Sequence, residues 1–253
     1  MDYFYLVRDK KQLASYQRFL ETFESKLEDY SAFLIRNYYV EDIPKAIIWA
    51  DKVSATEMLR QIPVPAYTNE TRIVMTPDLS VWRDIYLKQL GSYEDSAIKD
   101  WLTDHYQYVG ENYLLQIVGH ELAHWSELFE DDFDDYDSFI WFEEGMVEYI
   151  SRKYFLTSEE FKAEKLANRY LVDLFQNEHG WHSLNDFGQA TYDGNYASIF
   201  YEYWRSFLTV DELVMKVGSV DAVFKIYQEW LNTDHSQPLL DWLVQKEILT
   251  KEP

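Results

Sequence analysis

Residues 114–124 of the chain read Leu-Leu-Gln-Ile-Val-Gly-His-Glu-Leu-Ala-His, an apolar stretch that ends in two histidines and a glutamate. The apolar residues predict a buried helix. On a helix, His120 and His124 lie one turn apart, with Cβ atoms about 6 Å from each other on one face. Burying imidazole and carboxylate groups is costly unless something compensates them. Because two imidazoles on one face suit a single cation, the stretch predicts a metal site.

Glu121 directly follows the first histidine and lies about 100° round the helix from it. From there its carboxylate can reach a water on the metal without being a ligand itself, as the glutamate of an H-E-x-x-H zinc motif does. The alternative is a histidine pair that neighbouring carboxylates satisfy on a surface helix. The apolar residues on both sides of the motif argue against that alternative.

A catalytic zinc site needs a third protein ligand. The remaining histidines, His105, His179, His182 and His235, compete for this role with carboxylates further along the chain. Residues 141–149, Trp-Phe-Glu-Glu-Gly-Met-Val-Glu-Tyr, begin the next predicted helix, where acidic side chains on an antiparallel helix can face the first helix. The residues therefore predict a site of two histidines and one glutamate, with one zinc per chain.

Residues 117–125, Ile-Val-Gly-His-Glu-Leu-Ala-His-Trp, and the segment from Trp141 resemble the gluzincin zinc metallopeptidases, in particular the aminopeptidase N and leukotriene hydrolase group. That group has H-E-x-x-H, then eighteen residues, then a zinc-binding glutamate within W-x-x-E-G. The spacing points to Glu143 here, whereas alignment on Trp141 and Gly145 points to Glu144. A loop absorbs an inserted residue more readily than a helix changes its face, so the resemblance favours Glu144 and leaves Glu143 as the alternative.

Two further site residues come from helix spacing and from the resemblance. Glu148 stands one turn beyond Glu144, where it can bond the outer ring nitrogen of a zinc-bound histidine, as in thermolysin-like gluzincins, or be an ordinary solvated residue.

Residues 192–201, Tyr-Asp-Gly-Asn-Tyr-Ala-Ser-Ile-Phe-Tyr, are similar to the family's Y-E-K-G-x-A-x-x-F-Y segment, whose first tyrosine hydrogen-bonds the developing oxyanion. The resemblance implies that role for Tyr192, with Tyr196 as the alternative.

The resemblance implies zinc-dependent peptide-bond hydrolysis, with water activated by Glu121. It covers residues 112–230, somewhat under half of the chain. The sequence lacks a G-x-M-E-N segment, which in the aminopeptidases binds the substrate's amino terminus, so exopeptidase activity is not supported. The strand expected to align a peptide main chain is Thr71–Met75, as a sheet edge. The alternatives are a catalytically inactive, zinc-stabilised helical protein-binding module and a metal-free helical scaffold.

The composition favours helices, because 8 Gly and 6 Pro in 253 residues leave few turn signals for a many-stranded β protein. Short β-branched runs at 44–51 and 71–75 predict two strands, and Ser54 and Glu57 have capping-box spacing for a short helix between them. The helices predicted after the second strand are 79–90, 94–107, 111–129, 138–155, 158–177, 195–208, 219–231 and 237–248. We therefore expect a mainly α protein with a small β-sheet (α+β), with a zincin-like catalytic core and a helical C-terminal part.

We expect one domain, residues 1–253, because this length lies near the upper size of a single domain. Within it, residues 1–70 hold an N-terminal helix and the first strand and match no family pattern. Residues 71–155 are the expected zincin core, and residues 156–253 the expected helical part. With 47% hydrophobic residues, the chain has ample material for a sizeable core.

The N-terminal segment carries an apolar stripe that predicts a long amphipathic helix. Its apolar residues recur at steps of three and four, at Leu13, Tyr16, Leu20, Phe23, Leu27, Tyr30 and Leu34. Such a stripe can form a coiled coil with a second copy or lie along the chain's own core, and three heptads are few, which favours the second. A dimer through Leu13–Leu34 is left as the alternative.

The chain is strongly acidic, with 23 Lys and Arg against 45 Asp and Glu and a formal net charge of -22. This charge repels nucleic-acid phosphates and anionic membranes and attracts cationic peptides. We expect a peptide or protein substrate of basic character and no nucleic-acid partner. The acidic run at 130–137 is expected to be a solvated connector rather than a calcium site, because it lacks EF-hand spacing and glycine.

The cellular compartment is only weakly constrained. The sequence has no cysteine, which suits a reducing compartment without requiring one. Residues 1–9, Met-Asp-Tyr-Phe-Tyr-Leu-Val-Arg-Asp, carry charge before any long apolar run, unlike a secretory signal. No apolar stretch approaches the roughly 20 residues that span a bilayer. We therefore expect a cytoplasmic protein with no membrane contact.

Overall fold

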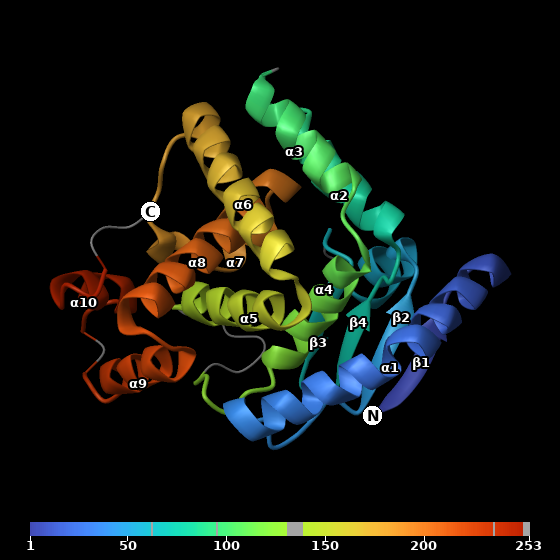
Figure 1. Ribbon diagram of the computed structural model, residues 1–253, viewed down its shortest axis with the longest axis horizontal. Coiled ribbons are helices and arrows are strands. Elements are labelled where there is room, and N and C mark those ends of the chain that lie inside the picture. The colour runs from blue at the N-terminus through green and yellow to red at the C-terminus, as the bar shows by residue number, and fades with distance from the viewer. Residues whose placement is uncertain (62, 95, 131–138, 235, 250–253) are drawn as a thin grey trace. The chain divides into compact units, whose positions relative to one another are not determined.

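A computed structural model describes residues 1–61, 63–94, 96–130, 139–234 and 236–249 (Figure 1). The chain forms two compact units, the first of Met1–Asp134 with Ile150–Phe161 and the second of Asp135–Tyr149 with Lys162–Pro253. Most described residues are helical, and four strands form one small mixed sheet. The predicted mainly α fold with a small β-sheet is therefore confirmed, and the zincin-like core stays a prediction.

The sheet belongs to the first unit and has the strand order β1-β2-β4-β3. Its strands are β1 (Asp2–Leu6), β2 (Ala46–Ala50), β3 (Ala66–Asn69) and β4 (Arg72–Met75). β1, β2 and β4 are parallel, whereas β3 runs antiparallel to β4 as an edge strand. The expectation that Thr71–Met75 forms an edge is wrong, because β4 has hydrogen-bonded neighbours on both sides.

Helix α1 (Lys10–Tyr38) covers one face of this sheet, where Phe19 packs edge-on against Trp49 of β2 with ring centroids 5.6 Å apart. Asp9 caps the helix by accepting a hydrogen bond from the Lys11 backbone. In the predicted stripe, Tyr16, Leu20, Leu27, Tyr30 and Leu34 are buried within the chain, and Leu13 and Phe23 are half-buried. The stripe is thus used by the chain's own core, and a dimer through it stays a prediction.

The opposite face of the sheet packs against η1 (Ser54–Leu59), a short π-helical segment. Ala50 follows Trp49 on β2 and therefore points the other way, where it joins a buried cluster with Ala55, Tyr67 and Val74. The predicted capping box is wrong, because η1 begins without a side-chain cap from Ser54. The Asp51 carboxylate instead accepts a hydrogen bond from the Ser54 backbone at 3.0 Å.

The helices lie close to where the amphipathic patterns predict them. In the first unit, α2 (Leu79–Leu90) packs against α3 (Ala97–Gln107), and α4 (Glu111–Ala123) packs against α1, β3 and β4. α5 (Ile140–Phe155) and α6 (Ser158–His179) each contribute residues to both units. The second unit adds η2 (Leu184–Asp186), α7 (Gln189–Tyr192), α8 (Tyr196–Val217), α9 (Val220–Leu231) and α10 (Leu239–Gln245).

The helix ends that differ most from the sequence prediction are those of α4 and α8. The helix predicted at 111–129 ends at Ala123, and the one predicted at 195–208 continues to Val217. Gly218 ends the longer helix in a left-handed conformation, with φ of 92°, which glycine adopts without steric cost. The second unit's core includes Phe142 stacked on Tyr227, with ring centroids 4.4 Å apart.

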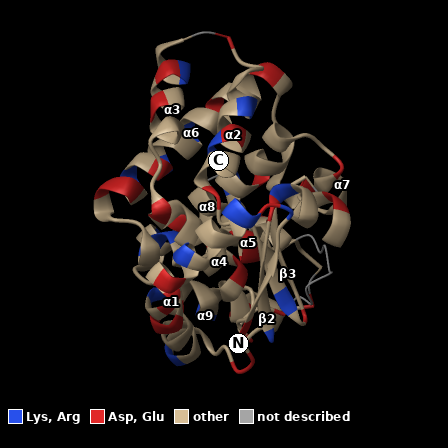
Figure 2. Cartoon of the chain, turned by 90° about the vertical axis from the view of Figure 1, so that its right-hand side faces the viewer, with Lys and Arg blue, Asp and Glu red and all other residues tan. Residues whose placement is uncertain are grey.

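Acidic residues occur on elements of both units, among them α1 and α6 (Figure 2). Most of the acidic run predicted as a connector, residues 131–137, lies outside the described residues. Within the described residues, no helix is both long and apolar enough to cross a bilayer.

Candidate metal centre

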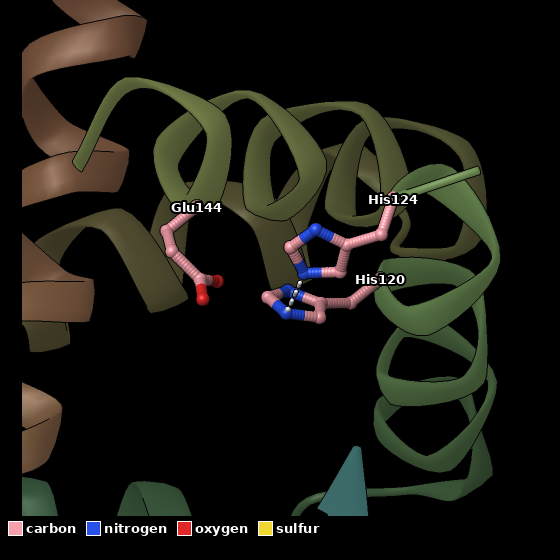
Figure 3. Close-up of side chains that lie close together, drawn as sticks. All are labelled: His120, His124 and Glu144. Carbon is pink, nitrogen blue, oxygen red and sulfur yellow. Dashed lines mark hydrogen bonds between the residues drawn. The ribbon is translucent and has the colours of Figure 1, made fainter. Parts of the chain in front are cut away.

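His120, His124 and Glu144 form a group that could hold a metal ion (Figure 3). One ligand atom from each residue lies within 4.8 Å of the other two. The two Nε2 atoms are 3.2 Å apart. Nitrogens bound to one tetrahedral zinc at 2.0–2.1 Å lie about 3.3 Å from each other, so the two imidazoles have the spacing of zinc ligands. Two imidazoles and one carboxylate are also a donor set that suits zinc.

The histidines take their positions from α4. His120 is buried in its last turn, and His124 follows at the C-cap with helical φ and ψ of -58° and -18°. The hydroxyl of Tyr30 donates a hydrogen bond to the Gly119 carbonyl at 3.1 Å, which ties α4 to α1. Trp125 donates its ring N–H to the Thr68 hydroxyl at 2.9 Å, which ties the end of α4 to β3.

Glu121 is buried on α4, and its charge acts on the edge strand β3. Burial raises the pKa of the Tyr67 phenol; the Arg72 and Arg60 charges lower this pKa, and the Glu121 carboxylate raises it. Arg60 lies over the Tyr67 ring, 5.3 Å from its centroid. The carboxylate that the sequence predicts as general base is therefore within electrostatic range of a strand at the sheet edge.

Glu144 is buried on α5 and accepts hydrogen bonds from two tyrosines. The Tyr203 hydroxyl lies 3.0 Å and the Tyr192 hydroxyl 3.3 Å from the same oxygen, Oε1. The two hydroxyl oxygens are 2.9 Å apart. The predicted oxyanion donor, Tyr192, thus contacts a residue of the metal-ligand group.

Tyr203 is a site residue that the sequence did not indicate. It lies on α8, 59 residues beyond the glutamate that it contacts, and no motif marks it among the 21 tyrosines. One weak signal in the sequence points to Tyr203, which lies shortly after residues 192–201, the segment that resembles the family's tyrosine motif. Three-dimensional packing, rather than local sequence, brings it to Glu144.

The remaining predicted residues take other places. Glu148 is buried on α5, and its bond to a histidine ring stays a prediction. Glu143 precedes Glu144 on α5 but is not in the group that could hold a metal ion, and Tyr196 stacks its ring on Phe200. The described histidines outside the group contact aromatic or acidic side chains: His105 meets Tyr113, His179 meets Phe175 and His182 meets Glu202. His235 lies outside the described residues.

Comparisons with protein-family models, curated proteins and solved structures found no match to this chain.

Proposed function

We propose that the chain is a zinc-dependent hydrolase of peptide bonds, with one zinc held by His120, His124 and Glu144. The observation that supports this most directly is the group itself, whose ligand atoms lie within 4.8 Å of one another on residues of an H-E-x-x-H motif and a downstream glutamate. The resemblance of these segments to gluzincins supplies the reaction type.

In the proposed mechanism, His120, His124 and Glu144 would hold the zinc, which would lower the pKa of a bound water to about 7 and polarise the substrate carbonyl. The Glu121 carboxylate takes a proton from the attacking water and later passes it to the leaving amine. Its burial on α4 strengthens its electrostatic interactions, because the surroundings screen charge less than bulk water does. The Tyr192 phenol donates a hydrogen bond to the oxyanion that forms on the carbonyl.

The substrate proposed for this site is an extended peptide that pairs with the outer edge of β3. This strand is terminal in the sheet order, and the end of α4 is tied to it through Trp125 and Thr68. Main-chain pairing of this kind aligns a peptide without demanding a particular side chain at every position. The net charge of -22 favours peptides of basic character, screened over about 10 Å at 0.1 M salt.

The decisive experiment compares Glu121→Gln with Glu111→Gln, an exposed glutamate at the start of the same helix. Both variants should retain about one zinc per chain by elemental analysis. Glu121→Gln should lose at least about 100-fold in the rate of cleavage of a peptide library, the usual scale for loss of a general base. Glu111→Gln should match the wild type, and a chelator should abolish cleavage that added zinc restores.

Other outcomes would separate the alternatives. Equal cleavage by Glu121→Gln and the wild type would exclude the proposed mechanism. One zinc per chain without cleavage of any peptide would favour the inactive, zinc-stabilised binding module. Absence of zinc from the purified protein, with no uptake of added zinc, would leave the metal-free scaffold. His124→Ala should lower the zinc content, which ties any metal found to this group rather than to surface carboxylates.

A further inference from the structure

The two tyrosines on Glu144 differ in how firmly they are held. Tyr203 lies in the interior of α8, a helix of 22 residues, whereas Tyr192 is the last residue of α7, a helix of four. The buried ring of Phe187 packs against both, with centroids 5.6 Å from Tyr203 and 6.1 Å from Tyr192. The long helix fixes the backbone of Tyr203, and the short segment leaves Tyr192 more dependent on its side-chain contacts.

Hydrogen counting limits what the two phenols can do together. Three oxygen–oxygen contacts join Tyr192, Tyr203 and Glu144, at 2.9, 3.0 and 3.3 Å. Each phenol has only one hydrogen to donate, so two hydrogens serve three contacts. The shorter contact to the carboxylate belongs to Tyr203, which makes it the better donor to Glu144. The Tyr192 hydrogen is then divided between Glu144 and the Tyr203 oxygen.

We propose that Tyr203 is a positioning residue that holds the Glu144 carboxylate for the metal, and that this lets the Tyr192 hydrogen turn to the substrate. This inference rests on the proposed function. When an oxyanion forms, Tyr192 can redirect its single hydrogen without releasing Glu144, because Tyr203 continues to donate to Oε1. Hydrogen bonds of this kind around a metal ligand fix its orientation and tune metal affinity.

The test measures zinc affinity directly, by competition with a chromogenic chelator, and needs no peptide substrate. Tyr203→Phe should weaken zinc binding about 10- to 100-fold, the usual cost of removing a partner of a metal ligand. Tyr192→Phe should change it less than about threefold, because the shorter hydrogen bond to Glu144 remains. Tyr201→Phe is the matched control, since its hydroxyl on the same helix contacts Gln176 at 3.0 Å instead. It should bind zinc as the wild type does.

A second readout separates positioning from general structural damage. With zinc added to saturation, Tyr203→Phe should recover most of its kcat for peptide cleavage, whereas Tyr192→Phe should remain at least about 100-fold lower with little change in KM. Equal zinc affinity in Tyr203→Phe and Tyr201→Phe would overturn the inference. If Tyr203→Phe does not fold, the Tyr192→Phe arm decides, because a 10-fold or greater loss of zinc affinity there contradicts the division of roles.

Failure of the inference and failure of the proposed function give different results. If the wild type binds no zinc, the proposed function is wrong, and the inference about Tyr203 falls with it. If the wild type binds zinc and cleaves peptides in a Glu121-dependent way, but Tyr203→Phe keeps its zinc affinity, only the inference is wrong.

Discussion

The two helices that carry the metal-ligand group are packed by different means next to their ligands. Each has a glycine beside a ligand, Gly119 before His120 on α4 and Gly145 after Glu144 on α5. A Cβ added at Gly119 would lie 2.5 Å from an edge carbon of the Phe155 ring and 3.1 Å from the Tyr30 ring. A Cβ added at Gly145 would meet the backbone oxygen of Ser206 on α8. Beside these glycines, α4 therefore packs against side chains, whereas α5 packs against the backbone of α8.

This difference matters because side chains can move by a few tenths of an ångström, whereas the backbone of a long helix yields only if the whole helix shifts. The hydrogen bonds next to these residues also differ between the two helices. Tyr30 and Trp125 connect α4 to neighbouring elements, whereas on α5 the Glu144 carboxylate itself accepts a hydrogen bond from Tyr203. The comparison predicts that α5 tolerates change beside its ligand less well than α4.

The largest expected effect is that of Gly145→Ala. The added methyl group would press on the Ser206 carbonyl and lie 2.7 Å from a Val210 methyl carbon, so α8 must shift. We expect a loss of about 3 kcal/mol in the free energy of unfolding, the upper end of typical overpacking costs, despite alanine's better helix propensity. Urea denaturation measures this loss. A variant as stable as the wild type would show that α5 and α8 are less closely packed than the structure indicates.

Gly119→Ala should cost less. The Phe155 and Tyr30 rings can move apart, and alanine gains about 1 kcal/mol in helix propensity over glycine, so we expect a net loss of about 1 kcal/mol. The same urea titration gives the comparison with Gly145→Ala. The contrast between the two helices would be broken if Gly119→Ala proved the more damaging of the pair.

Much of the α4 site could be predicted because helix geometry converts local spacing into position. His120 and His124 at i and i+4 need no distant contact to share a face, and the apolar residues around them indicate burial. Helix geometry alone does not identify the third residue of the group. The family's eighteen-residue spacing points to Glu143, whereas the Trp141 and Gly145 context points to Glu144. The metal-ligand group contains Glu144, and Gly145 has a packing reason to be glycine.

Features that depend on distant pairing could not be predicted in this way. β3 (Ala66–Asn69) is only four residues long and becomes a strand through pairing with β4. β1 pairs with β2, although the whole of α1 separates the two strands in the sequence. The sequence therefore predicts an edge at Thr71–Met75, whereas β3 takes that place in the sheet. Tyr203 was missed for the same reason, because its contact with Glu144 joins residues 59 apart in sequence.

Removing the hydrogen bond that connects the end of α4 to β3 should have a smaller effect on the free energy of unfolding. Thr68→Val removes the hydroxyl that accepts the Trp125 hydrogen bond at 2.9 Å and donates a long, weak one to the Arg72 carbonyl at 3.5 Å, while keeping side-chain volume and strand propensity. We expect a loss of about 1 kcal/mol in the free energy of unfolding, the usual net value of one hydrogen bond. Thr68→Ser retains the hydroxyl and should lie closer to the wild type in the same denaturation experiment. If valine and serine variants are equally stable, the hydrogen bond contributes nothing to anchoring α4.

The smallest effect concerns the opposite end of α4. Glu160 of α6 accepts hydrogen bonds from the Asn112 side chain of α4 at 2.9 Å and from the Thr157 backbone at 2.8 Å. Burial alone would raise the pKa of Glu160, but these hydrogen bonds outweigh it and hold the pKa below its usual value. The ionised carboxylate therefore contributes stability that is complete above the usual glutamate pKa and is lost as pH falls through the folded-state pKa.

Glu160→Gln keeps the shape of the side chain but removes its ionisation, so it isolates this contribution. The difference in unfolding free energy between wild type and variant should stay constant from about pH 7 to about pH 5 and shrink below about pH 4, where the carboxylate protonates. Glu159→Gln, at an exposed neighbouring position, is the matched control and should give a difference that varies less with pH. A Glu160→Gln difference that is the same at every pH would mean that the bonds to Asn112 and Thr157 do not favour the ionised carboxylate. The contact between the start of α4 and Glu160 of α6 would then depend on packing alone.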